Sequence, residues 1–151
     1  MRAETRETVF NHIKTLTIFT FVDLNKIENS FFENLKRLNT ENSTFYAFLA
    51  TPTNLVPICV TNRDGGGFFR EFGDFKIFVA TPKETRGGVS AYERISRELE
   101  NLSKRLTCVR ISNIVTGQSS MVVGDSFEAF TKQSYLESGS ITVNFYADVS
   151  I

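Results

Sequence analysis

His12 is the only histidine in the chain, and it is therefore the first residue to consider for acid–base chemistry near neutral pH. A histidine can also bind a metal ion or serve a nucleophile, but both roles need partner residues at a suitable spacing. No metal-ligand or triad motif includes His12. We therefore predict that His12 lies on a helix surface, that the protein binds no metal ion or cofactor, and that it is not an enzyme.

A glycine-rich segment, Asp64-Gly65-Gly66-Gly67, is the second candidate for chemistry, because glycine lets backbone N–H groups approach a phosphate. Phosphate-binding loops end in Gly-Lys-Ser/Thr and open directly into a helix. Here the aromatic, strand-like run Phe68–Phe72 follows instead. We predict a hairpin connection that tolerates positive φ angles.

A further interpretation is that this loop becomes ordered on a partner protein. Charges of both signs flank it, at Arg63, Asp64, Arg70 and Glu71. Mixed charge favours self-association over binding to a polyanion. The loop is thus a candidate interface between copies of the chain.

The remaining charged and aromatic residues give no sign of an active site. Seventeen basic and seventeen acidic residues cancel, so no net field attracts nucleic acid or an anionic membrane. Phe68–Phe72 could stack on bases, but it contains a single arginine, and we predict no sequence-specific nucleic-acid binding. We interpret the helical acidic residues as surface charge; they are Asp23, Glu28, Glu33, Glu93, Glu98 and Glu100.

Composition favours a single domain spanning residues 1–151, since a chain of this length buries enough surface for a core. The first residues are charged, and the apolar stretch Leu16–Leu24 is too short to cross a membrane. We expect a soluble, intracellular protein without a membrane partner. Cys59 and Cys108 lie in apolar, strand-like runs, which predicts buried free thiols.

The first third of the chain combines helical and strand patterns. Apolar residues at helical spacing predict a helix from Glu4 to Leu16, followed by a strand over Thr15–Val22, although one continuous helix is also possible. A second helix is expected around Ile27–Leu38. Two strands should follow, over Thr44–Leu49 and Val56–Thr61, the latter at a sheet edge or beginning at Pro57.

The middle of the chain contains the clearest helix. Gly73-Asp74 predicts a turn between Phe68–Phe72 and a strand over Phe75–Ala80. Ser90 and Glu93 then form a capping-box pattern at the start of a helix that ends near Leu106. Its polar face carries opposite charges four residues apart, which are Glu93/Arg97, Arg94/Glu98 and Glu100/Lys104.

The end of the chain alternates between apolar and polar residues. Strands are expected over Cys108–Val115, over Met121–Val123 and from Ile141 to Ile151, with a loop over Gly124–Gly139. The last strand would present a polar face to water, to a lumen or to a neighbouring subunit; this face comprises Thr142, Asn144, Tyr146, Asp148 and Ser150. The predicted fold class is α+β, a mixed or antiparallel sheet with one main amphipathic helix on one face and additional N-terminal helices.

This order of elements resembles the tail-terminator proteins of long-tailed phages. The resemblance rests on Phe75–Pro82, on Tyr92–Leu99 and on the alternation from Ile141 to Val149, and it covers roughly residues 56–151. An expected extra helix and strand over residues 17–50 depart from that pattern. The resemblance implies a structural virion protein that completes a tail tube as a homo-oligomeric ring, commonly of six subunits.

The resemblance further implies three partners, namely other copies of the chain, the tail tube protein and the head-tail connector protein. It places the protein in the virion tail, after assembly in the host cytoplasm. The candidate oligomer-interface residues are Arg63, Asp64, Gly65, Gly66, Gly67, Phe68, Arg70, Glu71, Asn144, Tyr146 and Asp148. Two alternatives remain open: another tail, neck or baseplate component, and a small-molecule-binding α+β regulatory domain.

Overall fold

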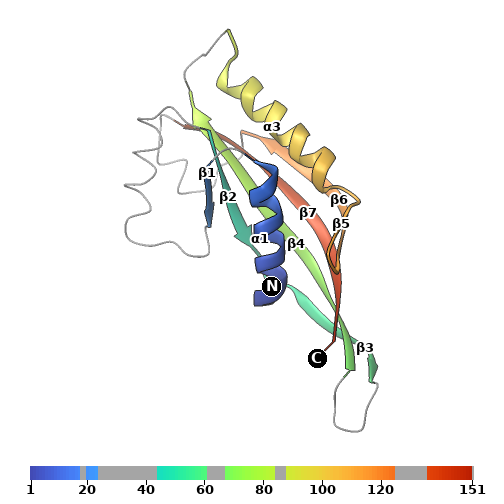
Figure 1. Ribbon diagram of the computed structural model, residues 1–151. Coiled ribbons are helices and arrows are strands. Elements are labelled where there is room, and N and C mark those ends of the chain that lie inside the picture. Colours follow the sequence, from blue (N-terminus) through green and yellow to red (C-terminus); the bar gives the residue numbers. More distant parts are fainter. Residues whose placement is uncertain (18–19, 24–43, 61–66, 84–87, 125–135, 151) are drawn as a thin grey trace.

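The computed structural model describes residues 1–17, 20–23, 44–60, 67–83, 88–124 and 136–150. Within these residues the chain is an α+β fold of two helices and a curled seven-stranded sheet (Figure 1). The helices are α1 (Ala3–Leu16) and α3 (Ala91–Leu106). The strands are β1 (Thr20–Asp23), β2 (Phe45–Ala50), β3 (Asn54–Val60), β4 (Gly67–Pro82), β5 (Arg110–Ile111), β6 (Ile114–Val123) and β7 (Leu136–Ser150).

The sheet is mixed, with strand order β1-β2-β4-β7-β6-β5 and β3 beside β4. β1 and β2 are parallel, and every other pair is antiparallel. The central pair is β4 and β7, whose register runs without a shift from Phe68↔Ser150 to Pro82↔Leu136. β7 occupies one edge of β4, while β3 and then β2 share the other edge. Among the described residues β3 pairs with β4 alone, which agrees with the edge position expected from Pro57.

The expected turn at Gly73-Asp74 is wrong, because both residues continue β4 and pair with Phe145 and Asn144 of β7. Glycine at position 73 serves a different purpose. A Cβ there would lie 2.9 Å from Cγ2 of Thr53, at the point where β4 exchanges β3 for β2 as its partner. Close approach, and not a turn, explains this glycine.

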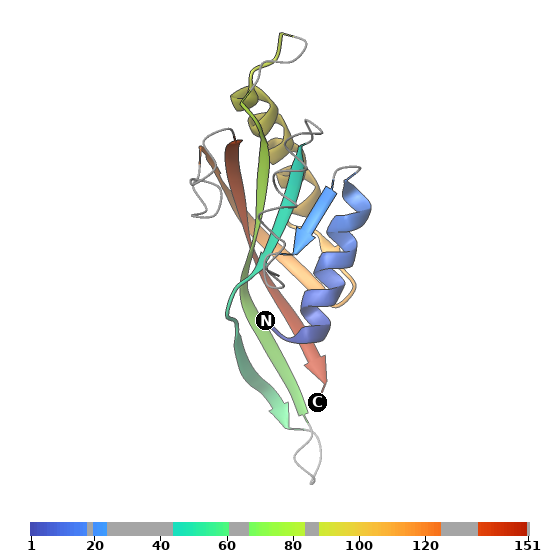
Figure 2. The same ribbon diagram turned by 90° about the vertical axis from the view of Figure 1, so that its left-hand side faces the viewer.

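Both helices contribute to a single core on one face of the sheet (Figures 1 and 2). Val9 and Ile13 of α1 are fully buried there, as is an apolar stripe of α3 formed by Ile95, Leu99, Leu102 and Leu106. Gly139 of β7 permits the contact with α3, since a Cβ at this position would lie 2.6 Å from Ile95 and 2.8 Å from Leu99. The predicted main amphipathic helix and its packing on the sheet are confirmed.

The start of α3 follows the capping pattern, because Ser90 Oγ accepts a hydrogen bond from the Glu93 N–H at 3.2 Å. Of the three charge pairs, Glu93 and Arg97 approach to 4.0 Å. The members of the expected pair Arg94/Glu98 have other partners. Arg94 donates to the Val89 and Pro82 carbonyls, and Glu98 accepts a hydrogen bond from the Tyr46 hydroxyl.

Three other expectations differ from the structure. The strand predicted over Cys108–Val115 is interrupted, because Cys108 and Ser112 adopt positive φ in turns around the short β5. Cys108 is exposed instead of buried. Thr15 and Leu16 are helical, so the first strand begins later than expected. The predicted helix over Ile27–Leu38 and the side chain of Cys59 lie outside the described residues.

Candidate functional site

One region of the sheet, which we call the exposed sheet face, lies on the side away from the helices. Period-two alternation along β7 buries Phe145, Ala147 and Val149. Four residues of the predicted polar face are exposed, Asn144, Tyr146, Asp148 and Ser150, whereas Thr142 is half-buried. Register then places cross-strand partners on the same side. The exposed sheet face comprises Val56, Phe68, Arg70, Phe72, Asn144, Tyr146 and Asp148.

Arg70 and Asp148 form the polar centre of this face. They are direct cross-strand partners, and the guanidinium donates through Nε at 2.7 Å and through Nη2 at 2.9 Å to the two carboxylate oxygens. These hydrogen bonds raise the pKa of Arg70 and lower the pKa of Asp148. The same guanidinium lies 4.4 Å from the ring centroid of Tyr146, within cation–π distance. The pair is therefore held in one orientation on an exposed surface.

Apolar side chains surround that pair. Phe72 is 41% exposed and lies between Asn54 and Tyr146 in the register, while Val56 lies beside Arg70. Aromatic residues and arginine are the types most enriched in binding hot spots. Contiguous exposed apolar surface on a soluble protein commonly marks a contact with another protein. The arrangement suits a protein interface and contains no nucleophile beside a base.

Five of the predicted interface residues thus come together here: Phe68, Arg70, Asn144, Tyr146 and Asp148. Val56 and Phe72 were missed. The alternation of Phe68, Arg70 and Phe72 was a usable signal, because it continues across Gly73 in step with β7. Of the other candidates, Gly67 is the buried first residue of β4. Arg63, Asp64, Gly65 and Gly66 lie outside the described residues.

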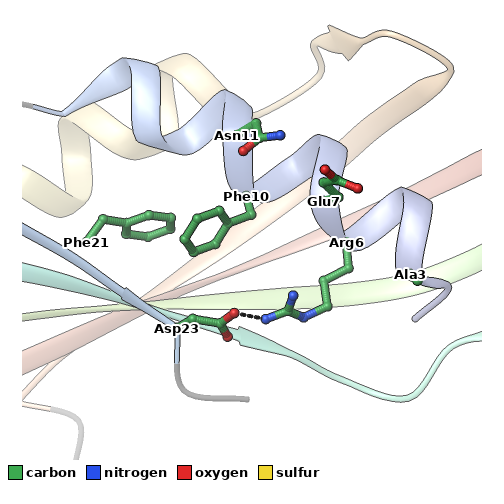
Figure 3. Close-up of a pocket in the computed structure, with 7 residues that line it drawn as sticks. All are labelled: Ala3, Arg6, Glu7, Phe10, Asn11, Phe21 and Asp23. Carbon is green, nitrogen blue, oxygen red and sulfur yellow. Dashed lines mark hydrogen bonds and ion pairs between the residues drawn. The ribbon is translucent and has the colours of Figure 1, made fainter. Parts of the chain in front are cut away.

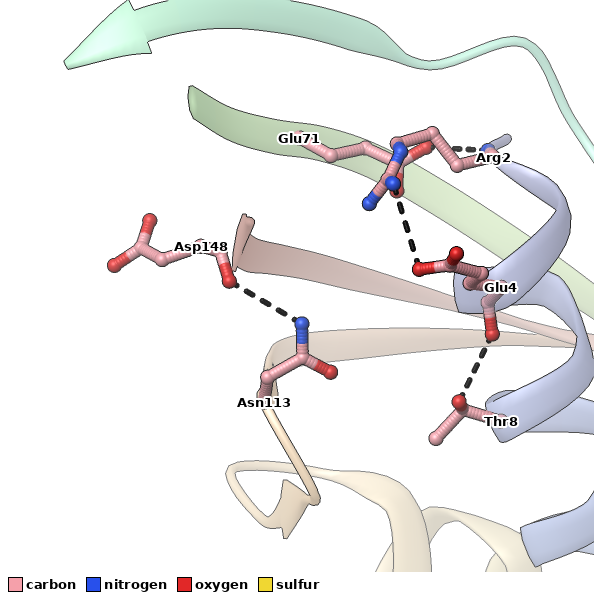
Figure 4. Close-up of polar contacts among 6 residues, drawn as sticks. All are labelled: Arg2, Glu4, Thr8, Glu71, Asn113 and Asp148. Atoms are coloured by element: carbon pink, nitrogen blue, oxygen red, sulfur yellow. Dashed lines mark hydrogen bonds and ion pairs between the residues drawn. The ribbon is translucent and has the colours of Figure 1, made fainter. Parts of the chain in front are cut away.

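Glu71 lies on the opposite side of β4 from the exposed sheet face, although it is adjacent to Arg70. Its side chain points to the opposite face and is completely buried (0% exposed) beside the start of α1. Oε2 accepts hydrogen bonds from the Arg2 N–H at 2.7 Å and from the Thr53 hydroxyl at 2.6 Å. Figure 4 shows this carboxylate approaching the first turn of the helix. Strand alternation turns Glu71 inward, so this predicted interface residue does not lie on the exposed sheet face.

Opposing effects act on the pKa of Glu71. Burial raises it, but hydrogen bonds from Thr5, Thr53 and the Arg2 backbone, together with the N-terminal ammonium, lower it below the ordinary value. A carboxylate at this position also faces the positive end of the α1 dipole. Glu71 is therefore a charged anchor for the helix.

A pocket of about 690 Å³ lies between α1 and β1 (Figure 3). Arg6 faces the pocket and forms an ion pair with Asp23. The ring centroids of Phe10 and Phe21 lie 4.5 Å apart. The remaining lining residues are Ala3, Glu7 and Asn11. The pocket is large enough for a small ligand. Arg6, the one arginine among its described lining residues, already forms an ion pair with Asp23.

Clusters of potential metal ligands are absent from the part of the chain that the structure describes. That part holds no group of three or more His, Cys, Asp or Glu side chains able to bind a metal ion. His12 lies in α1, partly buried. No helix among the described residues has the length and apolar character needed to cross a membrane.

Near β7, the Asn113 amide donates to the Asp148 carbonyl at 3.2 Å, a contact that fixes the turn after β5 (Figure 4).

Comparison with known proteins adds no family assignment, since the chain matches neither a protein-family model nor a curated protein.

Proposed function

We propose that this protein is a structural subunit of a phage tail, which completes the tail tube as a homo-oligomeric ring and joins it to the head connector. The observation that carries the proposal is the exposed sheet face, in which apolar side chains surround the Arg70–Asp148 pair. The order of elements from β4 through α3 to β7, on which the resemblance to tail-terminator proteins rests, supports it.

The exposed sheet face has properties that a static assembly contact needs. β4 and β7 form a long, continuously registered pair, so the side chains of the face are held by backbone hydrogen bonds. Figure 1 shows β3 and the start of β4 extending beyond both helices. A rigid, protruding surface loses little conformational entropy on binding. In this proposal the face contacts another protein of the tail, either a neighbouring copy or the tube.

Paired substitutions test this function. Phe72→Glu combined with Tyr146→Glu introduces two charges among exposed apolar groups and should abolish ring formation or binding to tail tubes, while the monomer stays folded. Tyr92→Glu is the control, because Tyr92 is 60% exposed on α3, away from this face. Light scattering after size exclusion and negative-stain images of tube ends are the measurements. Unchanged assembly of the double variant would contradict the proposal.

The pocket between α1 and β1 favours a second candidate, a small-molecule-binding regulatory domain. A ligand of that class would raise the thermal unfolding midpoint, and the midpoint would continue to rise with the logarithm of the ligand concentration above the dissociation constant. Substituting Phe10→Trp would narrow the pocket and abolish such a shift, without affecting assembly.

A tail, neck or baseplate component other than the terminator would share the exposed sheet face and differ in the tail structure that it binds.

A further inference from the structure

Two stretches of strand have an outer edge that no described residue pairs with. β3 pairs with β4 alone. At the opposite side of the sheet, β5 pairs with Ile114 and Val115 of β6, which leaves the outer edge of residues 118–123 open among the described residues. An open edge presents a row of backbone donors and acceptors that can pair with another chain.

Neither edge carries the charged side chains with which monomeric proteins commonly protect theirs, although Pro57 and the register shift beside it interrupt the row of backbone donors on β3. Such proteins place charged side chains, above all lysine, on their edge strands. β3 reads Asn-Leu-Val-Pro-Ile-Cys-Val, and residues 118–123 read Gln-Ser-Ser-Met-Val-Val, so both lack charge. Both also expose large apolar side chains: Leu55, Val56 and Ile58 on β3 and Met121 and Val122 on β6. The two edges are similar in length and chemistry.

Strand direction makes the two edges compatible. β3, β4, β7 and β6 are successive antiparallel neighbours, so β3 and β6 run in opposite directions. A second copy placed beside the first in the same orientation would therefore bring its β6 antiparallel to β3. Antiparallel pairing with a copy in the same orientation is heterologous, and repetition leads to a ring or a filament.

We infer that β3 of one copy pairs with residues 118–123 of the next, which continues the sheet from subunit to subunit. This inference rests on the self-assembly that the proposed function requires. It assigns the contact between neighbouring subunits to the two strand edges. The exposed sheet face is then available to bind the tail tube. The partner is a second copy of this chain, because one chain supplies both neutral edges with matching direction and length.

The register also sets the geometry of the assembly. The middle of the open β6 segment is level with Ile141 of β7, and the middle of β3 is level with Val149. About eight residues, or ~26 Å, separate these levels along the strand, against a subunit width of four strands, or ~19 Å. Neighbouring subunits are therefore displaced along their strands, and in a closed ring the strands tilt steeply relative to the axis.

Edge-blocking variants test the inference. Leu55→Lys with Ile58→Lys protects the β3 edge, and Met121→Lys with Val122→Lys protects the β6 edge, all at exposed positions. Each variant alone should be monomeric by light scattering under conditions in which the wild type is oligomeric. An equimolar mixture retains one unmodified pair of edges and should form a dimer of twice the monomer mass. Tyr92→Lys is the control and should assemble like the wild type.

The outcomes separate this inference from the proposed function. If both edge variants assemble like the wild type, edge pairing is overturned while the ring remains. If the mixture stays monomeric, head-to-tail pairing is overturned. A wild type that is monomeric at every concentration overturns both, and an oligomer that never binds tail tubes contradicts only the tail function. Circular dichroism verifies folding, and the single variants Ile58→Lys and Val122→Lys replace any double variant that unfolds.

Discussion

Arg70 and Glu71 are consecutive residues of β4 with opposite surroundings. Arg70 pairs with Asp148 on the exposed sheet face, and Glu71 is completely buried beneath the start of α1. One residue thus contributes to a surface available to partners, and the next attaches the N-terminal helix to the sheet. Substitutions at the two positions should have different consequences.

Glu71 should make stability depend on acid. Its pKa is lowered in the folded protein, so its contribution is complete above the unfolded value of ~4.3 and is lost as the pH falls through the folded value. Glu71→Gln should lower the free energy of unfolding by about 1–3 kcal/mol at pH 7, because buried donors lose a charged acceptor. The difference from the wild type should shrink below about pH 4.

Urea unfolding at a series of pH values measures this difference. Glu100→Gln, which alters an exposed carboxylate on α3, is the control and should remain close to the wild type at pH 7. Parallel stability curves for Glu71→Gln and the wild type across pH 3–7 would contradict the lowered pKa of the buried carboxylate.

Gly139 should tolerate no side chain. A Cβ there would lie 2.6 Å from Ile95 and 2.9 Å from the Val122 carbonyl oxygen, which belongs to the backbone and cannot rotate away. Gly139→Ala should therefore destabilise the fold by roughly 1–3 kcal/mol through overpacking between α3 and β7. Gly117→Ala is the matched control, with its nearest neighbour at 3.8 Å. Equal thermal midpoints for the two variants would contradict the close packing of α3.

Asp148 should matter for assembly and little for folding. Its carboxylate and the Arg70 guanidinium are both exposed, and exposed ion pairs add little to the stability of a monomer. Asp148→Asn removes the charge that orients Arg70 over Tyr146, and we expect weaker binding to tail tubes at an unchanged thermal midpoint. Glu93→Gln disrupts another exposed pair, with Arg97 on α3, and should leave assembly intact. A large drop in the thermal midpoint of Asp148→Asn would indicate a structural role instead.

Local signals were sufficient to predict α3, the edge position of β3 and the inward and outward alternation of β7. They failed where the decisive contact is distant in sequence. Gly73-Asp74 has the chemistry of a turn, yet pairing with β7 and the proximity of Thr53 keep it in a strand. Glu71 is flanked by charge and aromatic residues, and its burial depends on contacts with Thr53 and with the Arg2 N–H, which is 69 residues away in sequence.

Only part of the exposed sheet face could be predicted from the sequence, because some of its residues become neighbours through strand pairing between distant segments. Tyr146 and Asp148 follow from alternation within one strand, whereas Val56 becomes their neighbour only through the pairing of β3 with β4 and of β4 with β7. Sequence alone does not define which strands are adjacent. The open outer edges of β3 and β6 depend on that order as well, and no single segment indicates them.

In the proposed function, copies of this chain close a tail tube as a ring. Negative-stain imaging of the wild-type protein, added to purified tail tubes during their growth, tests it most directly. We expect a ring at one end of each tube and an arrest of elongation. A protein that stays monomeric in light scattering at every concentration, and that never appears on tube ends, would contradict the claim.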